Sequence, residues 1–165
     1  MKPVMMRESD REWDGVTGSD CLRASLASVL ELPLDEVPHF LGNPDTARNW
    51  PGELEYWLFG RGLTVYPVAP SSDLAATLAY MGQRWAGDFY LLCGRSGEDY
   101  GHVVVGCGDA IVHDPDPGVP RGSHCLTGPV PTCGKYVALV IQPLQSSPAR
   151  HKSAVRHRVQ EGTCG

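Results

Sequence analysis

Three residue types that together perform nucleophilic catalysis follow one another along the chain as Cys21, His102 and Asp114. A cysteine attacks a carbonyl group as its thiolate, so it needs a base beside it, and the base needs a third group that orients it. Cys21 is therefore the candidate nucleophile, His102 the candidate general base and acid, and Asp114 the candidate orienting residue. Chain order does not decide the matter by itself, because the same triad geometry occurs on unrelated folds.

The segment 18–32 must position the cysteine, and its pattern is that of a turn followed by an amphipathic helix. Apolar side chains recur there at i, i+4, i+7 and i+8, at Leu22, Leu26, Val29 and Leu30. We expect the helix to begin at Cys21, with Ser19 or Asp20 as its cap, and to end before Pro33. The N–H groups and the dipole at a helix start favour a thiolate. A small buried core cysteine is the alternative interpretation.

The histidine and the aspartate stand on two extended runs, 101–106 and 110–114, that a glycine-containing turn joins. This pattern predicts a β-hairpin. His102 opens a run of three valines, where a polar residue needs a reason. A histidine with its hydrogen bonds satisfied at a strand end, and a turn-forming aspartate before Pro115, are the alternatives without a function.

Two registers of this hairpin are open. A three-residue loop at 107–109 places His102 directly opposite Asp114, with Cβ atoms about 5 Å apart. A two-residue turn instead places His102 opposite Pro115. Asp116 is also followed by proline, and it is the substitute orienting residue if the register differs by two.

The remaining pattern predicts helices in the first half of the chain and strands in the second. Helical segments are expected at 33–38, at 51–59 and from a cap at 71–73 to Gly82. Further strands are expected at 63–68, 89–93 and 135–141, with a long loop at 115–134. Together these elements predict an α+β domain over residues 1–143, with N-terminal helices packed on a C-terminal antiparallel sheet.

Composition limits the possible partners. The chain has 165 residues and a net charge of −5, which suits one domain and makes nucleic acid an unlikely partner. Residues 144–165 carry four Lys or Arg against one Glu, and we expect a basic, disordered tail there. No apolar run approaches the ~20 residues of a membrane span, and no signal peptide is visible, so a cytoplasmic location is expected. The oligomeric state is not predicted.

The six cysteines do not predict a disulfide framework in a chain of this length without a secretory signal. A zinc-stabilised domain could draw its ligands from Cys107, His113, His124, Cys125 and Cys133. None of these spacings matches a usual zinc pattern, so no metal is predicted. No nucleotide or flavin motif is present, and no cofactor is predicted.

The motifs around the candidate residues resemble those of papain-like cysteine peptidases of the bacteriocin-processing, double-glycine type. They resemble even more closely the small stand-alone relatives that occur in bacterial and phage genomes. The resemblance rests on the Asp20-Cys21 helix start, on the run 101–105 and on the run 112–115, and it covers residues 18–142. It implies a papain-like architecture, the three catalytic roles given above and a peptide or protein substrate.

Two positions differ from that family. Its members carry a glutamine several residues before the cysteine to help bind the oxyanion, whereas the first glutamine here is Gln83, and Leu22 stands where a glycine often follows the cysteine. The Cys21 backbone N–H is then the expected first oxyanion donor. Ser19 is the candidate for the second, and Tyr100 or a tryptophan indole N–H are further candidates.

These residues together predict a thiol-dependent hydrolase that acts on a peptide, isopeptide or amide bond through a thioester. An acyl transferase or a deamidase would use the same scaffold. The alternative from another class is a catalytically inactive papain-like module that binds a peptide or a host protein.

Overall fold

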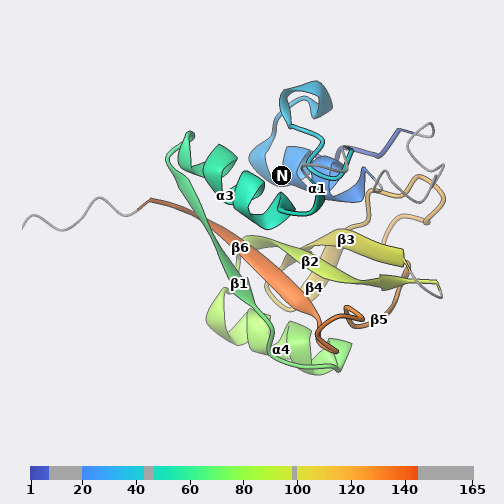
Figure 1. Cartoon of the computed structure of the whole chain (residues 1–165). Coiled ribbons are helices and arrows are strands. Elements are labelled where there is room, and N and C mark those ends of the chain that lie inside the picture. The colour runs from blue at the N-terminus through green and yellow to red at the C-terminus, as the bar shows by residue number, and fades with distance from the viewer. Residues whose placement is uncertain (8–19, 43–46, 98–99, 145–165) are drawn as a thin grey trace, which may run out of the picture.

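An antiparallel sheet is the element on which the helices pack, as the computed structural model shows (Figure 1). The structure describes residues 1–7, 20–42, 47–97 and 100–144. The strands are β1 (Leu63–Val68), β2 (Phe89–Ser96), β3 (Tyr100–Cys107), β4 (Ala110–His113), β5 (Leu126–Gly128) and β6 (Val137–Pro143). The helices are α1 (Cys21–Leu30), the 3-10 turn η2 (Leu34–Glu36), α3 (Trp50–Phe59) and α4 (Leu74–Arg84). The α+β class predicted from the sequence is therefore confirmed.

The strands run in the order β1-β6-β2-β3-β4, with β5 paired to one end of β2. The first strand of the chain thus lies at an edge beside the last one, and Pro67 of β1 lies opposite Leu139 of β6. An edge is where a strand tolerates proline, because one side of its backbone has no ladder partner. From the sequence alone, the proline in this run favours an edge position or a strand end.

Helices cover both faces of the sheet (Figure 1). Because successive side chains of a strand point to opposite faces, Leu91, Val103 and Val105 pack in one core with α1 and α3. Tyr90 and Val104 pack in the other core with α4. The two cores fix the sheet between two helical layers.

Helix α1 lies deep in the protein, and most of its buried residues are small. The buried residues of α1 are Cys21, Leu22, Ala24, Ser25, Leu26, Ala27 and Ser28. Small side chains let the helix backbone approach the sheet closely, and the hydroxyl of Ser25 donates a hydrogen bond to the carbonyl of Val103 at 3.1 Å. Ser25 lies one turn after Cys21, and Val103 follows His102. This hydrogen bond therefore fixes the part of α1 that carries the cysteine beside the part of β3 that carries the histidine.

The first residues of the chain cover α1 from outside. The N–H of Val4 donates to the hydroxyl of Ser28 at 2.8 Å, and the N–H of Met6 donates to the carbonyl of Pro115 at 2.9 Å. Val4 also offers its carbonyl to Nε2 of His113 at 2.9 Å. The segment thus ties α1 to the chain that follows β4.

Two boundaries differ from the prediction. Helix α1 ends at Leu30 rather than immediately before Pro33, because Glu31 adopts a left-handed conformation with φ of 56°. The predicted loop 115–134 contains β5, which has only three residues and so gives too short a pattern to recognise. The predicted basic tail lies outside the described residues, apart from Leu144.

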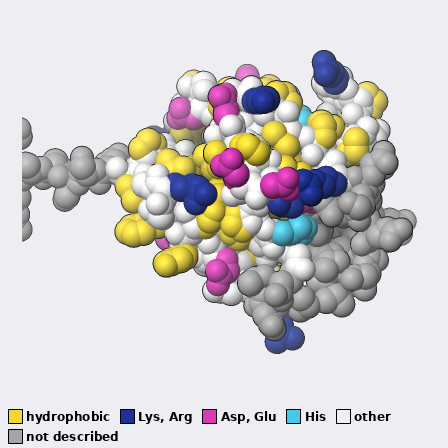
Figure 2. Space-filling model, turned by 90° about the horizontal axis from the view of Figure 1, so that it is seen from above, with side chains coloured by type: hydrophobic (Ala, Val, Ile, Leu, Met, Phe, Trp, Pro, Cys, Tyr) yellow, Lys and Arg dark blue, Asp and Glu magenta, His cyan; other side chains and the backbone are white. Residues whose placement is uncertain are grey.

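Within the described residues, none of the helices combines the length and the apolar character that crossing a bilayer requires. An apolar cavity of about 500 Å³ lies on the surface beside α3. Its lining includes His39, Phe40, Trp57 and Arg61. Figure 2 looks down on this side of the molecule and shows hydrophobic side chains gathered between separate charged ones.

The bond between Ser25 and Val103 gives a first prediction. Ser25→Ala removes one buried hydrogen bond and should lower the free energy of unfolding by about 1 kcal/mol, as measured by urea denaturation. Ser72→Ala is the control, because Ser72 is exposed and its loss should change the free energy of unfolding by less than about 0.5 kcal/mol. Equal effects of the two substitutions would contradict the proposed importance of this contact.

Candidate active site

Cys21 occupies the first position of α1, as predicted, and only 2% of it is exposed. The first bond of the helix runs from the N–H of Ala24 to the carbonyl of Asp20 at 2.9 Å. The Cys21 N–H thus belongs to the first turn, where the helix itself supplies no acceptor. The cysteine therefore lies at the positive end of the helix dipole.

Asp20 is the N-terminal flanking residue of the helix, but its side chain makes no capping hydrogen bond. Its carboxylate is fully buried and lies 3.8 Å from Nη1 of Arg23 and 3.6 Å from Nε2 of His39. The sequence predicted a side-chain cap from Ser19 or Asp20. For Asp20 this was wrong, because its carboxylate lies toward two basic side chains instead, and Ser19 lies outside the described residues.

The hairpin that carries the histidine begins with one of the two expected turns, but its register then changes. Cys107 lies opposite Ala110, so the turn is the two-residue Gly108-Asp109 and not the three-residue loop. The register then shifts, and Val105 lies opposite His113. Because this is the last β3–β4 pair, His102 lies beyond the part of β3 that β4 covers. Asp114 follows β4 and reaches His102 from outside the ladder.

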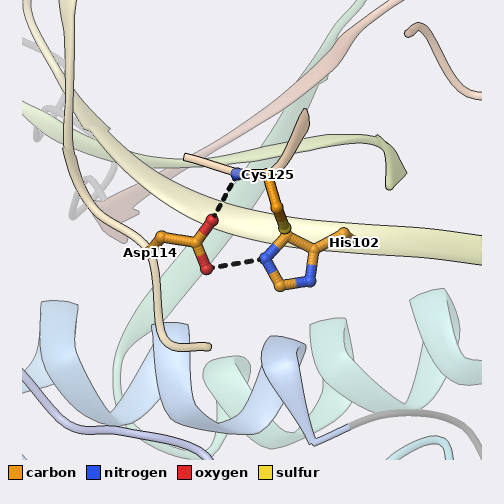
Figure 3. Close-up of side chains that lie close together, drawn as sticks. All are labelled: His102, Asp114 and Cys125. Atoms are coloured by element: carbon orange, nitrogen blue, oxygen red, sulfur yellow. Dashed lines mark hydrogen bonds and ion pairs between the residues drawn. The ribbon is translucent and has the colours of Figure 1, made fainter. Parts of the chain in front are cut away.

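His102 and Asp114 nevertheless form the predicted contact (Figure 3), with Nε2 of the imidazole donating to Oδ1 of the carboxylate at 2.8 Å. The same oxygen accepts the N–H of Asp116 at 3.0 Å, and Oδ2 accepts the N–H of Cys125 at 2.9 Å. Only 5% of His102 and 7% of Asp114 is exposed. Three donors thus hold a buried carboxylate in one orientation, and the carboxylate fixes the ring.

The electrostatics of the pair keep both groups charged. Burial lowers the pKa of His102, but the hydrogen bond to Asp114 and the interactions with the side chains of Cys125 and Cys21 outweigh it and raise the pKa well above its usual 6.5. Burial raises the pKa of Asp114, but its bonds to His102 and to two backbone N–H groups lower it to about 2. The site therefore holds an imidazolium beside a carboxylate at neutral pH.

Both Cys21 and Cys125 lie close enough to the imidazole to affect its pKa. Figure 3 shows the Cys125 side chain pointing at the ring, while Nδ1 lies on the side away from Asp114. Sequence reasoning had placed Cys125 only among possible zinc ligands. No local sequence pattern places Cys125 near His102, because its position depends on tertiary structure. Cys125 stands just before β5, which pairs with β2 and not with β3 or β4.

Asp116 and the residues of the zinc alternative were the other predicted site residues. Asp116 contributes its backbone N–H to Asp114, while its own carboxylate accepts the N–H of Gly118 at 2.7 Å. It is therefore not the residue that orients His102. Of the cysteines and histidines in the zinc alternative, Cys125 alone belongs to a group with metal-ligand spacing among the described residues, and its companions are His102 and Asp114.

The buried pair makes the second prediction. Asp114→Asn removes the negative charge and should lower the pKa of His102 by roughly 1–3 units, as measured by NMR titration of the ring. Asp116→Asn is the matched control and should leave the pKa of His102 within a few tenths of a unit. If the pKa of His102 fell equally in both variants, the conclusion that Asp114 rather than Asp116 orients His102 would be contradicted.

The same substitution has a pH-dependent effect on stability. The raised pKa of His102 contributes stability that is fully present below pH 6.5 and is lost as the pH rises through the folded value. The lowered pKa of Asp114 contributes stability that is present above pH 3.8 and is lost as the pH falls toward about 2. The free energy of unfolding of the wild type should therefore exceed that of Asp114→Asn by the largest amount between pH 3.8 and pH 6.5, where both contributions are present. The expected difference there is roughly 3–5 kcal/mol. A difference that is constant from pH 3 to 9 would contradict this.

Comparisons with family models, with curated proteins and with solved structures find no match to this chain.

Proposed function

We propose that the chain is a papain-like thiol hydrolase that cleaves a peptide, isopeptide or amide bond. The observation that carries the proposal is the position of the His102 ring. Its Nε2 is held by the buried carboxylate of Asp114 at 2.8 Å, and the ring interacts with the Cys21 thiol at the start of a buried helix. A nucleophile beside a base, with the base oriented by a third group, is the arrangement that covalent acyl chemistry requires.

In the first half of the proposed reaction, His102 is the imidazolium described above and carries the proton that Cys21 has given up, and the Cys21 thiolate attacks the carbonyl carbon of the substrate. The carbonyl oxygen becomes an oxyanion, which the backbone N–H of Cys21 in the first helical turn stabilises. The carbon–nitrogen bond then breaks as His102 passes its proton to the leaving amine. The acyl group remains on Cys21 as a thioester.

In the second half, water attacks the thioester while His102 accepts its proton. The carbon–sulfur bond breaks and the carboxylic acid leaves, so that the Cys21 thiolate and the His102 imidazolium are restored. Asp114 stays ionised throughout, and it holds the ring and stabilises the imidazolium. An amine in place of water would give acyl transfer, and a side-chain amide in place of the peptide bond would give deamidation.

A specific observation favours a second candidate, an inactive papain-like module that binds a peptide. Cys21 is 2% exposed, whereas the surface beside it carries an apolar cavity of about 500 Å³. The two features are linked, because His39 lines the cavity and lies 3.6 Å from the carboxylate of Asp20, the residue before the cysteine. A binding module would keep the cavity and need no reactive thiol.

Alkylation of the thiols separates the two candidates. At pH 6 the hydrolase should react with iodoacetamide at Cys21 at least about 10²-fold faster than at its other cysteines, since the proposed mechanism requires a reactive thiolate at the helix start beside the His102 ring. Cys93 is an internal reference, because burial and the neighbouring Cys21 and Cys133 raise its pKa to about 12. Peptide mass spectrometry assigns the modified residue. Uniformly slow labelling at every cysteine would contradict the proposal that Cys21 is an activated nucleophile.

An acyl-enzyme test measures turnover itself. With p-nitrophenyl acetate, wild type should release nitrophenolate in a burst, carry an acetyl group on Cys21 and continue at a steady rate. His102→Asn should lose about 10²–10⁴-fold in the steady rate, because it removes the general acid and base. Cys21→Ala should show no burst, while Cys133→Ala, at an exposed cysteine, should behave as wild type. A burst that survives Cys21→Ala would overturn the assignment of the nucleophile.

A further inference from the structure

Three potential metal ligands of different chemistry meet in the candidate active site. One ligand atom each from His102, Asp114 and Cys125 lies within 4.8 Å of the other two. Figure 3 shows the three side chains converging from β3, from the chain after β4 and from the chain before β5. The triad of the proposed function uses only two of them. The thiol of Cys125 is therefore a donor in the site that has no role in that reaction.

We propose that His102, Asp114 and Cys125 form a binding site for a zinc ion, which occupies the position of the proton between His102 and Asp114. Nitrogen, oxygen and sulfur are all ligands that zinc accepts, and three protein ligands with one open position form a common zinc geometry. Hard cations such as Mg²⁺ prefer oxygen ligands alone and should not compete. The fourth position is left for water.

The distances allow such a site with a small adjustment. Zinc bonds of about 2.0–2.3 Å place tetrahedral ligand atoms about 3.3–3.7 Å apart. Nε2 of His102 and Oδ1 of Asp114, now 2.8 Å apart, would separate by about half an ångström. The Cys125 sulfur would move toward them from within 4.8 Å. One proton from the imidazole and one from the thiol pass to water when the ion binds, so charge and atoms balance.

The surroundings supply what a metal site needs beyond its ligands. The backbone N–H groups of Asp116 and Cys125 already hold the carboxylate in place, and such outer contacts orient metal ligands. Asp114 also lines a cavity of about 530 Å³, together with Pro3, Met5 and several residues between Val112 and Ser123. Together with the half-buried position of Cys125, this cavity provides an entry path for an ion.

Zinc at this position would block the reaction, and this consequence rests on the proposed function. An imidazole whose Nε2 binds the metal no longer has Asp114 as its orienting partner. Since the metal carries two positive charges, the ring also loses its ability to accept a proton from Cys21. Zinc binding would therefore be a reversible inhibition in which Cys125 is the residue that decides affinity.

Cobalt(II), which substitutes for zinc, tests the site in the full-length protein. Wild type titrated with Co²⁺ should develop a thiolate-to-cobalt charge-transfer band and the visible bands of a tetrahedral ion, and added Zn²⁺ but not Mg²⁺ should displace it. Cys125→Ser should abolish the charge-transfer band and weaken Zn²⁺ binding by at least the ~10–100-fold that loss of an outer partner costs. Cys133→Ser, at an exposed cysteine, and Cys21→Ser should keep the band.

A band that persists in Cys125→Ser, or one that disappears in Cys21→Ser or Cys133→Ser, would overturn the assignment. Asp114→Asn provides a second ligand variant if Cys125→Ser fails to fold, and it should also weaken Zn²⁺ binding. The outcome does not depend on catalysis. A cobalt band with an unreactive Cys21 would retain the metal site and reject the hydrolase, whereas fast alkylation of Cys21 with no cobalt band would do the reverse.

Discussion

The packing of α1 against β3 is the contact on which the candidate site depends. Cys21 and His102 are far apart in the sequence. They lie close together only if α1 has one particular position along β3. Small buried residues of α1 allow close approach, and the hydrogen bond from Ser25 to Val103, 78 residues later in the chain, sets the register. A sliding helix would move Cys21 by several ångströms per turn, because each residue rises 1.5 Å along a helix. The same contact therefore serves both the core and the site.

The second constraint is electrostatic. A buried imidazolium and a buried carboxylate each lose hydration, and burial shifts both pKa values toward the neutral forms. Their bond to each other opposes both shifts, and two backbone N–H groups that point at Asp114 lower the pKa of that carboxyl further. Those groups come from Asp116 and Cys125, on either side of the long segment after β4. That segment, which the sequence describes only as a loop rich in proline and glycine, thus supports the pair.

Local patterns predicted the parts of this arrangement that depend on nearby residues. The start of α1 at Cys21, the α4 helix with its Asp73 cap and the edge position of β1 all follow from residue spacing and turn chemistry. The hairpin register does not, because the shift near Val105 accompanies a bond from His113 to Val4, 109 residues away. Cys125 was missed as a member of the site for the same reason. Its position depends on how β5 pairs with β2, and a three-residue strand carries too little pattern to predict a partner.

The imidazole of His102 interacts with three side chains, those of Asp114, Cys21 and Cys125, and its role depends on what Nε2 binds. With Asp114 on Nε2 and Cys21 nearby, the ring is oriented for proton transfer. With a metal on Nε2, the same carboxylate becomes a ligand and the ring is no longer a base. The proposed catalysis and the proposed metal binding would therefore exclude each other at this site, although they use two of the same side chains. In the metal-free state Cys125 contributes its backbone N–H to Asp114 and its side chain to the His102 ring, and in the proposed metal-bound state its sulfur is a ligand. A substitution of its side chain therefore affects both states, although the N–H that holds Asp114 is retained whatever the side chain.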